Sequence, residues 1–275
     1  MRIERIDIEC RTRTPGGKTA AYVLGDERCL LVDPAGTTPT LSSRLDDVTD
    51  IAVTHHHDDH VGAVEAAAET GATVWCRSGR EEAFEAATGV APDRTFRKGT
   101  TIETDTGRVR IVETPGHTPE HVAFAFDDGR RLLVGDLAVL DGSVVVGAPD
   151  GDMRAYLTSL RRLRARKPTR LYPAHGPIID DPEACLRRLL RHRLDRERRV
   201  LEAVEDGNRS VAAILEAAYE KDLRGVEDLA GMTVRAHLAK LGHEGRIRWD
   251  GARADPVDGR LCSRHPKLWM AGVPE

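Results

Sequence analysis

The stretch Thr54-His55-His56-His57-Asp58-Asp59-His60 decides the fold of this chain, because it places metal-binding side chains at close and regular spacing. It follows the pattern H-x-H-x-D-H, and the side chains at the ligand positions are His55, His57, Asp59 and His60. A catalytic zinc ion accepts neutral imidazole and carboxylate ligands and leaves one position open for water. Four such groups within six residues can hold parts of two metal sites.

The flanking residues place this motif on a turn between a strand and a helix. Residues 50–54 form a short apolar segment with β-branched side chains, and residues 61–69 are rich in strong helix formers. The positive N-terminal end of that helix would face an anion held by the metals. His56 and Asp58 alternate with the ligand positions, so we expect them to point away from the metals and assign them no chemistry.

Length, charge and cysteine content fit an ordinary protein of one large domain, or of one domain with an appendage, since the chain has 275 residues and a net charge of −4. Charges interrupt its first ten residues, and no later apolar run approaches the ~20 residues of a membrane span. We therefore expect a cytoplasmic protein with no membrane partner. Five scattered cysteines without C-x-x-C spacing indicate neither a disulfide framework nor a thiolate zinc cluster.

Three further apolar segments each end in one ligand candidate: His117 follows residues 109–113, Asp136 follows residues 131–135, and His175 follows residues 170–173. Gly135 would let the backbone come close to a bulky site. Any one of these side chains alone is more often a hydrogen-bonded turn residue. The same placement at four strand ends instead indicates two zinc ions that share the Asp136 carboxylate and a water, with iron or manganese as alternative metals.

With these motifs the sequence resembles the metallo-β-lactamase superfamily, in which H-x-H-x-D-H, G-H-T, G-D and a final A-H or G-H follow one another. Here the later motifs are Gly116-His117-Thr118, Gly135-Asp136 and Ala174-His175, and the match spans roughly residues 17 to 180. The resemblance implies an α/β fold, an αββα sandwich with the site at one edge. It also implies the distribution of ligands: His55, His57 and His117 for the first zinc, Asp59, His60 and His175 for the second, and Asp136 between them.

Two more polar residues stand close to these motifs. Residues 20–25 and 28–33 read as a hairpin that ends in Asp33, and His121 comes four residues after His117. A carboxylate beside a metal ligand fixes the imidazole tautomer. A strand-end aspartate is equally a turn residue, so both interpretations of Asp33 stay open, and His121 is treated in the same way.

The sequence changes character after residue 182, so we expect a catalytic domain at 1–182, a small α+β domain at 183–250 and a tail at 251–275. Helical patterns at 182–205, 210–219 and 232–241 precede a strand at 245–251, an order that resembles a winged helix. A DNA-binding regulator would use Thr233, Arg235, His237 and Lys240 on the recognition helix. Residues 185–250 carry 14 basic and 12 acidic side chains, and this small excess favours a packing module instead. In the tail, Cys262 and His265 indicate a metal pair only weakly.

The pairing of this appendage with the catalytic body resembles the β-lactamase-like 2 branch, which includes endoribonucleases that cut single-stranded RNA. We therefore expect a binuclear zinc hydrolase whose metal-activated hydroxide attacks a phosphodiester of single-stranded RNA, with Asp59 as a second, catalytic carboxylate. A small thioester or lactone, as in the glyoxalase II and lactonase branches, is the rival substrate. The low aromatic content of 4% counts modestly against RNA, and Trp249 is the stacking candidate.

The identity of the ligand residues bears on three other activities found in this superfamily. A bridging Asp136 disfavours lactam hydrolysis, and His57 in place of a glutamate disfavours the di-iron oxygen-reducing relatives. A sulfur dioxygenase that uses one iron shares the H-x-H-x-D-H motif and remains open. The oligomeric state is also left open by the sequence.

Overall fold

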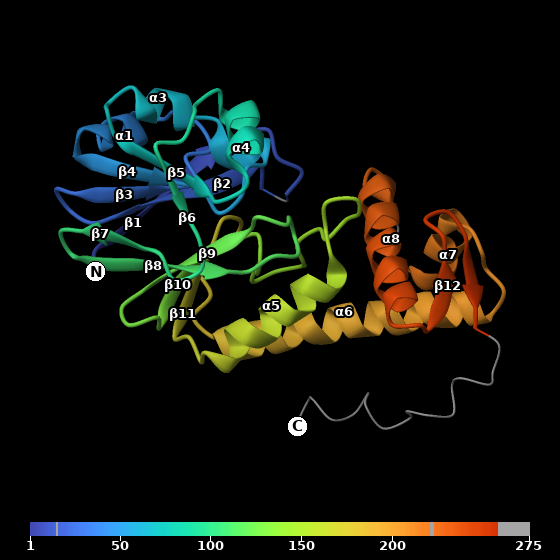
Figure 1. The fold of residues 1–275 in the computed structure, drawn as a ribbon. Helices are drawn as coiled ribbons and strands as arrows, with labels where there is room; N and C mark the ends of the chain where they lie inside the picture. Colours follow the sequence, from blue (N-terminus) through green and yellow to red (C-terminus); the bar gives the residue numbers. More distant parts are fainter. Residues whose placement is uncertain (15, 221–222, 258–275) are drawn as a thin grey trace. The chain divides into compact units, whose positions relative to one another are not determined.

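A computed structural model describes residues 1–14, 16–220 and 223–257 of the chain (Figure 1). These residues divide into two compact units. The first unit comprises Met1–Val144 and Arg154–Arg191, and the second comprises Val145–Met153 and the described residues from His192 onward. Helix α6 (Pro182–Glu205) belongs to both units, and the domain limits expected from the sequence stay predictions. Cys262 and His265 lie outside the described residues.

The first sheet of the first unit has six strands in the order β1-β2-β3-β4-β5-β6. Their bounds are Ile3–Glu9, Lys18–Leu24, Cys29–Val32, Val48–Ala52, Thr73–Arg77 and Arg94–Phe96. The strands β1, β2 and β3 pair antiparallel, as the hairpin pattern predicted for β2 and β3, and β3 to β6 pair parallel. Parallel neighbours bring the ends of β3 and β4 to the same edge, and the histidine-rich turn follows β4 at that edge.

The second sheet has five strands in the order β11-β10-β9-β8-β7. In chain order they are β7 (Thr101–Thr104), β8 (Gly107–Glu113), β9 (Val122–Phe126), β10 (Arg131–Gly135) and β11 (Arg170–Pro173). One apolar cluster joins the inner faces of both sheets and includes Tyr22, Phe96, Phe124 and Tyr172. The three strand ends predicted to carry single ligands are therefore those of β8, β10 and β11.

Helices cover the outer faces of the two sheets in the first unit (Figure 1). Helices α1 (Pro39–Ser42), α3 (Val64–Ala68) and α4 (Glu81–Thr88) lie over the first sheet, and the turn η1 (Leu45–Asp47) directly precedes β4. Helix α5 (Met153–Ala165) lies between β10 and β11 in the chain and is held by the Tyr156 hydroxyl, which donates to the Leu137 carbonyl at 2.8 Å. This layering is the expected αββα sandwich, a mixed α/β fold.

The single helix expected at residues 61–69 is wrong in detail, because the chain forms two short helices there, α2 (Asp58–Val61) and α3. The Ala63 N–H leaves the helical pattern and donates to the Pro34 carbonyl at 2.8 Å. At Gly62, an added Cβ would lie 2.4 Å from the Ala35 carbonyl oxygen. Tertiary contact with the segment after β3 therefore overrides the local helix propensity.

The second unit consists of helices followed by a hairpin. After α6 come α7 (Val211–Ala218), α8 (Glu227–His243), β12 (Ile247–Trp249) and β13 (Ala254–Pro256), and the two strands pair antiparallel. A separate apolar cluster includes Val204, Ile214, Leu238 and Leu241. The order of elements agrees with the sequence pattern, while the winged-helix identity of this unit remains a prediction. Among the described residues, no helix is both long and apolar enough to cross a membrane.

The structure does not support the hypothesis that α8 is a DNA-recognition helix. Thr233, His237 and Lys240 are buried, and the Thr233 hydroxyl donates within the helix to the Leu229 carbonyl at 2.9 Å. Arg235 is exposed but donates to the Gly251 carbonyl at 3.0 Å. The winged-helix resemblance placed these four side chains on a recognition helix, whereas three of them are buried within the second unit.

Candidate metal centre

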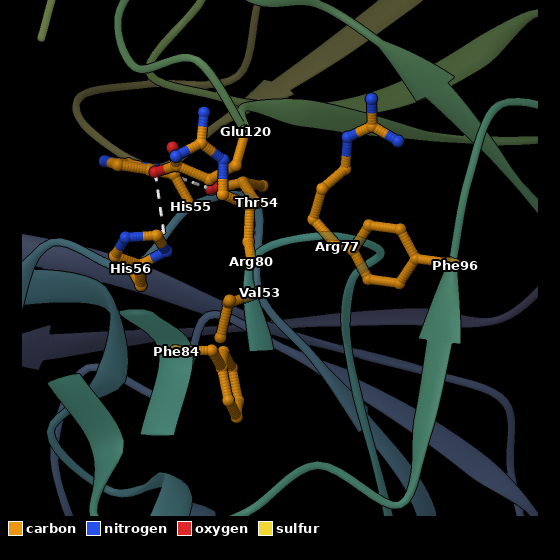
Figure 2. Close-up of a pocket in the computed structure, with 9 residues that line it drawn as sticks. All are labelled: Val53, Thr54, His55, His56, Arg77, Arg80, Phe84, Phe96 and Glu120. Atoms are coloured by element: carbon orange, nitrogen blue, oxygen red, sulfur yellow. Dashed lines mark hydrogen bonds and ion pairs between the residues drawn. The ribbon is translucent and has the colours of Figure 1, made fainter. Parts of the chain in front are cut away.

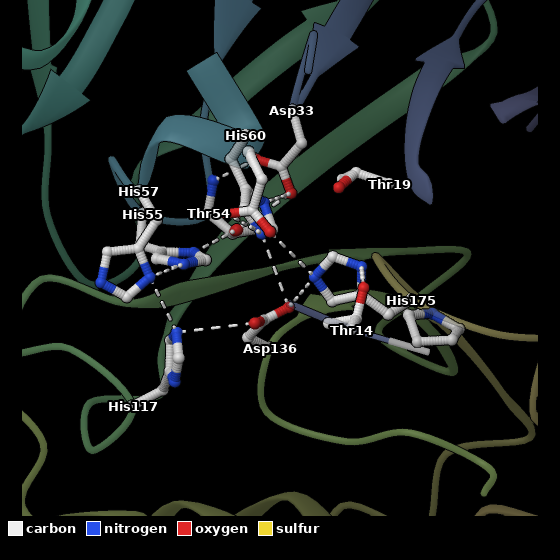
Figure 3. Close-up of polar contacts among 12 residues, drawn as sticks. Thr14, Thr19, Asp33, Thr54, His55, His57, His60, His117, Asp136 and His175 are labelled. Carbon is white, nitrogen blue, oxygen red and sulfur yellow. Dashed lines mark hydrogen bonds and ion pairs between the residues drawn. The ribbon is translucent and has the colours of Figure 1, made fainter. Parts of the chain in front are cut away.

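Three histidines from two loops form the first group of the site (Figure 3). His55 and His57 lie on the turn after β4, and His117 lies on the turn after β8. The distance from His55 Nε2 to His57 Nδ1 is 3.0 Å, and that from His57 Nδ1 to His117 Nε2 is 3.1 Å. Two nitrogens bound tetrahedrally to one zinc lie about 3.3 Å apart, because each Zn–N bond is about 2.0–2.1 Å long. These three imidazoles are therefore spaced as ligands of one ion.

A second group joins the same turn to the end of β11. His175 Nε2 lies 3.7 Å from Asp59 Oδ2, and His60 Nε2 lies 3.9 Å from Asp59 Oδ1. His60 and His175 are buried, whereas the Asp59 side chain keeps 18% of its surface exposed. Asp59 is thus the member of this group that solvent or a substrate reaches most readily.

Asp136, at the end of β10, lies between the two groups. Its Oδ1 is 3.2 Å from His175 Nε2 and 3.6 Å from His60 Nε2, while its Oδ2 is 3.5 Å from His117 Nε2. One carboxylate oxygen thus faces each group, the arrangement expected of a bridging ligand. Gly135 lets β10 approach the site closely, since φ is +46° there and an added Cβ would lie 2.6 Å from Thr54 Oγ1.

The ligand atoms of three sets of residues each lie within 4.8 Å of one another: His55, His57 and His117; Asp59, His60 and His175; and His55, His60 and Asp136. All seven side chains expected from the sequence are therefore brought together. The first two sets agree with the distribution that the resemblance implied. The third connects them through Asp136.

Unpartnered buried atoms test whether the site fits metal ions. Among the described residues, His60 Nε2, His175 Nε2 and Asp136 Oδ1 are buried and have no hydrogen-bond partner. Polar atoms buried in this way are costly unless something compensates them. Since imidazole nitrogen and carboxylate oxygen are both zinc ligands, the residues fit a pair of divalent cations.

Asp33 contacts residues of the histidine-rich turn. Of the two interpretations left open by the sequence, the structure therefore favours a carboxylate that orients a ligand over a simple turn residue. Its carboxylate accepts from the Thr54 N–H at 2.7 Å and from the Thr54 hydroxyl at 2.9 Å, and its Oδ2 lies 3.1 Å from His60 Nδ1. Asp33 is buried and has φ +53°, a left-handed conformation that is uncommon for a residue with a side chain. The strand-end conformation thus directs the carboxylate at His60.

Two other contacts hold ligand-bearing segments. His121 Nε2 accepts from the Asp136 N–H at 3.1 Å, and its Nδ1 lies 2.8 Å from the Thr114 hydroxyl. Burial lowers the pKa of His121 to about 3, so the ring is neutral and can accept. On the other side, His175 Nδ1 lies 3.0 Å from the Lys18 carbonyl oxygen, which fixes the proton on Nδ1 and leaves Nε2 for a metal.

The pKa shifts within the site follow burial and the charged groups that the ligand candidates place beside one another. Burial lowers the pKa of His55 and His57, so both are neutral imidazoles. Burial alone would lower the pKa of His60 and raise that of Asp136, but Asp33 and then Asp136 raise the pKa of His60, and His175 and then His60 lower the pKa of Asp136. Asp136 consequently stays ionised, as a ligand of a cation must.

His56 was expected to carry no chemistry, and the structure shows a contact that the sequence did not reveal. Its ring lines a small pocket beside the site with Val53, Thr54, His55, Arg77, Arg80, Phe84, Phe96 and Glu120 (Figure 2). His56 Nδ1 lies 3.5 Å from Glu120 Oε1. The close spacing of Glu120 to His117 along the chain was the one available signal.

The fold and this site define the class of protein. The model of the metallo-beta-lactamase superfamily matches residues 13–175, which is more than half of the chain. The chain therefore belongs to the metallo-beta-lactamase superfamily, and it is a metal-dependent hydrolase of that fold.

Similar proteins agree with this assignment. A "Beta-lactamase-like protein 2 homolog" of Drosophila melanogaster is 30% identical over 250 residues, which cover 84% of each chain. The crystal structure of a metallo-beta-lactamase family protein from Thermus thermophilus has a TM-score of 0.74 at 22% identity, and covers 93% of this chain and 98% of that one. A crystal structure of the protein TTHA1623, described as a di-iron-bound form, has a TM-score of 0.50 at 28% identity, and covers 66% of this chain and 98% of that one.

Proposed function

We propose that this protein is a binuclear zinc hydrolase that cleaves phosphodiester bonds of single-stranded RNA. The observation that carries the binuclear part is Asp136, whose two carboxylate oxygens face different ligand groups. Similarity to the β-lactamase-like 2 branch supports RNA as the substrate. We further propose a cytoplasmic location, which was expected from the sequence.

Each residue of the site has a role in this proposal. His55, His57 and His117 would hold one zinc ion, Asp59, His60 and His175 the other, and Asp136 would contact both. Bound zinc lowers the pKa of water and stabilises negative charge on a substrate oxygen. The Asp59 carboxylate is partly exposed at the rim of the second group, so it would accept a proton from an attacking water. Asp33 orients His60, and His121 orients the Asp136 backbone.

Zinc is the first choice of metal because the site offers only nitrogen and oxygen ligands, most of them imidazoles. The same ligand types bind iron and manganese. The di-iron form of the 28% identical relative keeps iron as an alternative for this chain. Elemental analysis of the purified protein separates two zinc ions from two iron ions, and either pair from the single iron of a sulfur dioxygenase.

A second candidate function, hydrolysis of a small thioester or lactone, is favoured by the surface of the described residues. Their exposed large hydrophobic residues are Leu140 and Val226, and neither is aromatic. Trp249, the expected stacking residue, is only partly buried but packs against the core of the second unit. Proteins usually bind single-stranded nucleic acid by stacking its bases on exposed aromatic side chains. The described residues offer no such exposed aromatic surface, which favours a smaller substrate.

The deciding experiment offers the metal-loaded protein a single-stranded RNA oligonucleotide, a small thioester and a labelled DNA duplex. The Asp136→Ala variant serves as the blank for each substrate. We expect RNA cleavage that the blank lacks. Thioester turnover without RNA cleavage would replace the first proposal by the second, and duplex binding without any turnover would support the regulator hypothesis instead.

A further inference from the structure

A buried carboxylate outside the seven ligands lies against the histidine-rich turn. Glu120 is on the loop between β8 and β9, and its side chain is 6% exposed. Its Oε1 lies 3.5 Å from Nδ1 of His56, which is 21% exposed (Figure 2). Among the described residues, the polar contact found for the Glu120 carboxylate is the one with the His56 ring. Arg77, from the same pocket, pairs with Glu113 at 2.8 Å instead.

The loop that carries Glu120 is tied to the site at each side of this residue. Three residues earlier, His117 belongs to the first ligand group, and one residue later His121 accepts from the Asp136 N–H. Two residues later, the Val122 N–H donates to the Thr54 carbonyl at 2.9 Å. Glu120 and His56 therefore make a side-chain connection between the two turns that supply the first ligand group.

Burial makes this connection energetically significant. A carboxylate removed from water is costly unless a partner compensates it, and an exposed pair would contribute little. His56 lies between His55 and His57 in the chain. A contact that holds the His56 ring therefore also restrains the backbone of the turn that carries both ligands. Contacts that orient metal ligands typically change metal affinity by about 10–100-fold when they are removed.

We propose that Glu120 is a positioning residue for the metal centre. Through His56 it holds the turn that carries His55 and His57 against the turn that carries His117, and so sets the geometry of that ligand group. Among the described residues, no hydrogen bond or ion pair joins Glu120 or His56 to Asp59, His60 or His175, so we expect the second ligand group to change less. The inference rests on the proposed binuclear site, because it assigns Glu120 to one of the two ions.

The test is titration of the metal-free full-length chain with Zn²⁺, followed by absorption spectroscopy with Co²⁺ as a probe of ligand geometry. The Glu120→Ala variant should bind one of two ions about 10–100-fold more weakly, with a smaller loss for the other ion. Its Co²⁺ spectrum should change most for the weakened site. Glu113→Ala is the matched control, because Glu113 forms an ion pair in the same region but faces Arg77 rather than His56.

A double-mutant cycle shows whether Glu120 acts through His56. The Glu120→Gln variant keeps the side-chain volume and guards against a folding defect, and it is combined with His56→Asn. We expect that Glu120→Gln weakens one binding step in the unchanged chain but has no further effect once His56 is replaced. Additive effects, or two unchanged binding steps in both Glu120 variants, would overturn the inference. Failure of the unchanged chain to bind two ions would instead overturn the proposed function.

Discussion

The two units of this chain each bury a cluster of charged and polar side chains, but the two clusters are built differently. In the first unit the side chains come from loops at strand ends and direct atoms without hydrogen-bond partners at one another. In the second unit they come from helices α6 and α8: Glu197 accepts from Lys240 at 2.7 Å, and His237 Nδ1 lies 3.5 Å from Glu197 Oε2. Among the described residues, every group able to hold a metal lies in the first unit.

This difference separates a ligand site from a structural network. In the first unit five imidazoles and two carboxylates form three groups of converging ligand atoms, which a bound cation would compensate. In the second unit Lys240 compensates the Glu197 carboxylate, although Glu197 Oε2 and both His237 ring nitrogens are also buried without a hydrogen-bond partner. Buried atoms without a hydrogen-bond partner therefore do not identify a functional site by themselves, whereas several ligand groups that converge on one another do.

The largest effect that this comparison predicts is the loss of turnover in Asp136→Ala. Removal of the group between both ligand sets should lower turnover by more than the about 100-fold that an orienting residue costs. The fold should remain, since the β10 backbone contacts do not involve this carboxylate. Turnover assays measure the loss of activity, metal analysis measures the bound metal per chain, and far-ultraviolet circular dichroism measures whether the fold remains. Full activity in this variant would contradict the binuclear site.

A second prediction concerns the structural network, and its effect is on stability. Lys240→Met leaves Glu197 buried without its closest cation, which should lower the free energy of unfolding by about 3–5 kcal/mol. The double variant Glu197→Leu with Lys240→Met should be more stable than the single one, because no unpaired charge remains. Urea unfolding measures both values, and the metal content of these variants should equal that of the unchanged chain.

The matched control for the network is Arg198→Ala on α6. Arg198 pairs with Glu202 at 2.8 Å, but both side chains are about half exposed. Such a pair contributes about 0.5 kcal/mol or less. If Arg198→Ala and Lys240→Met destabilise the chain equally, burial of the Glu197 pair has no special importance.

The seven ligand candidates could be predicted because each lies where an apolar strand pattern stops. Such boundaries are local, and β8, β10 and β11 end within a residue or two of the expected positions. The tertiary contacts were not local. Glu120 gave no signal beyond its distance along the chain from His117, and the contact of Asp33 with His60 depends on a left-handed backbone at Asp33.

Helix α8 shows the complementary limit of periodicity. Apolar spacing correctly identified Val234, Leu238 and Leu241 as core residues. It could not show that His237 and Lys240 are also covered, because that depends on Glu197 and its neighbours on another helix. A sequence pattern identifies the face that must be buried but does not show that the remaining face is free.

The smallest predicted effect is a pH dependence of stability in the second unit. Burial lowers the pKa of His237, Arg193 and Lys240 lower it further, and Glu197 only partly opposes them. The unfolded chain therefore takes up a proton near the ordinary value of 6.5 that the folded chain does not. This contribution to stability is fully present above pH 6.5 and is lost as the pH falls below it.

Replacing His237 isolates that contribution. Between pH 7.5 and pH 5.5 a histidine kept neutral in the folded state should account for about 1 kcal/mol of the decrease in unfolding free energy. Glu197, whose pKa is also lowered, stays ionised in both states over this range and adds nothing. His237→Leu should therefore show a smaller decrease than the unchanged chain in urea unfolding at the two pH values. His243→Leu, an exposed histidine on the same helix, should retain the full decrease, and an equal decrease in all three chains would show that His237 is protonated in the folded state.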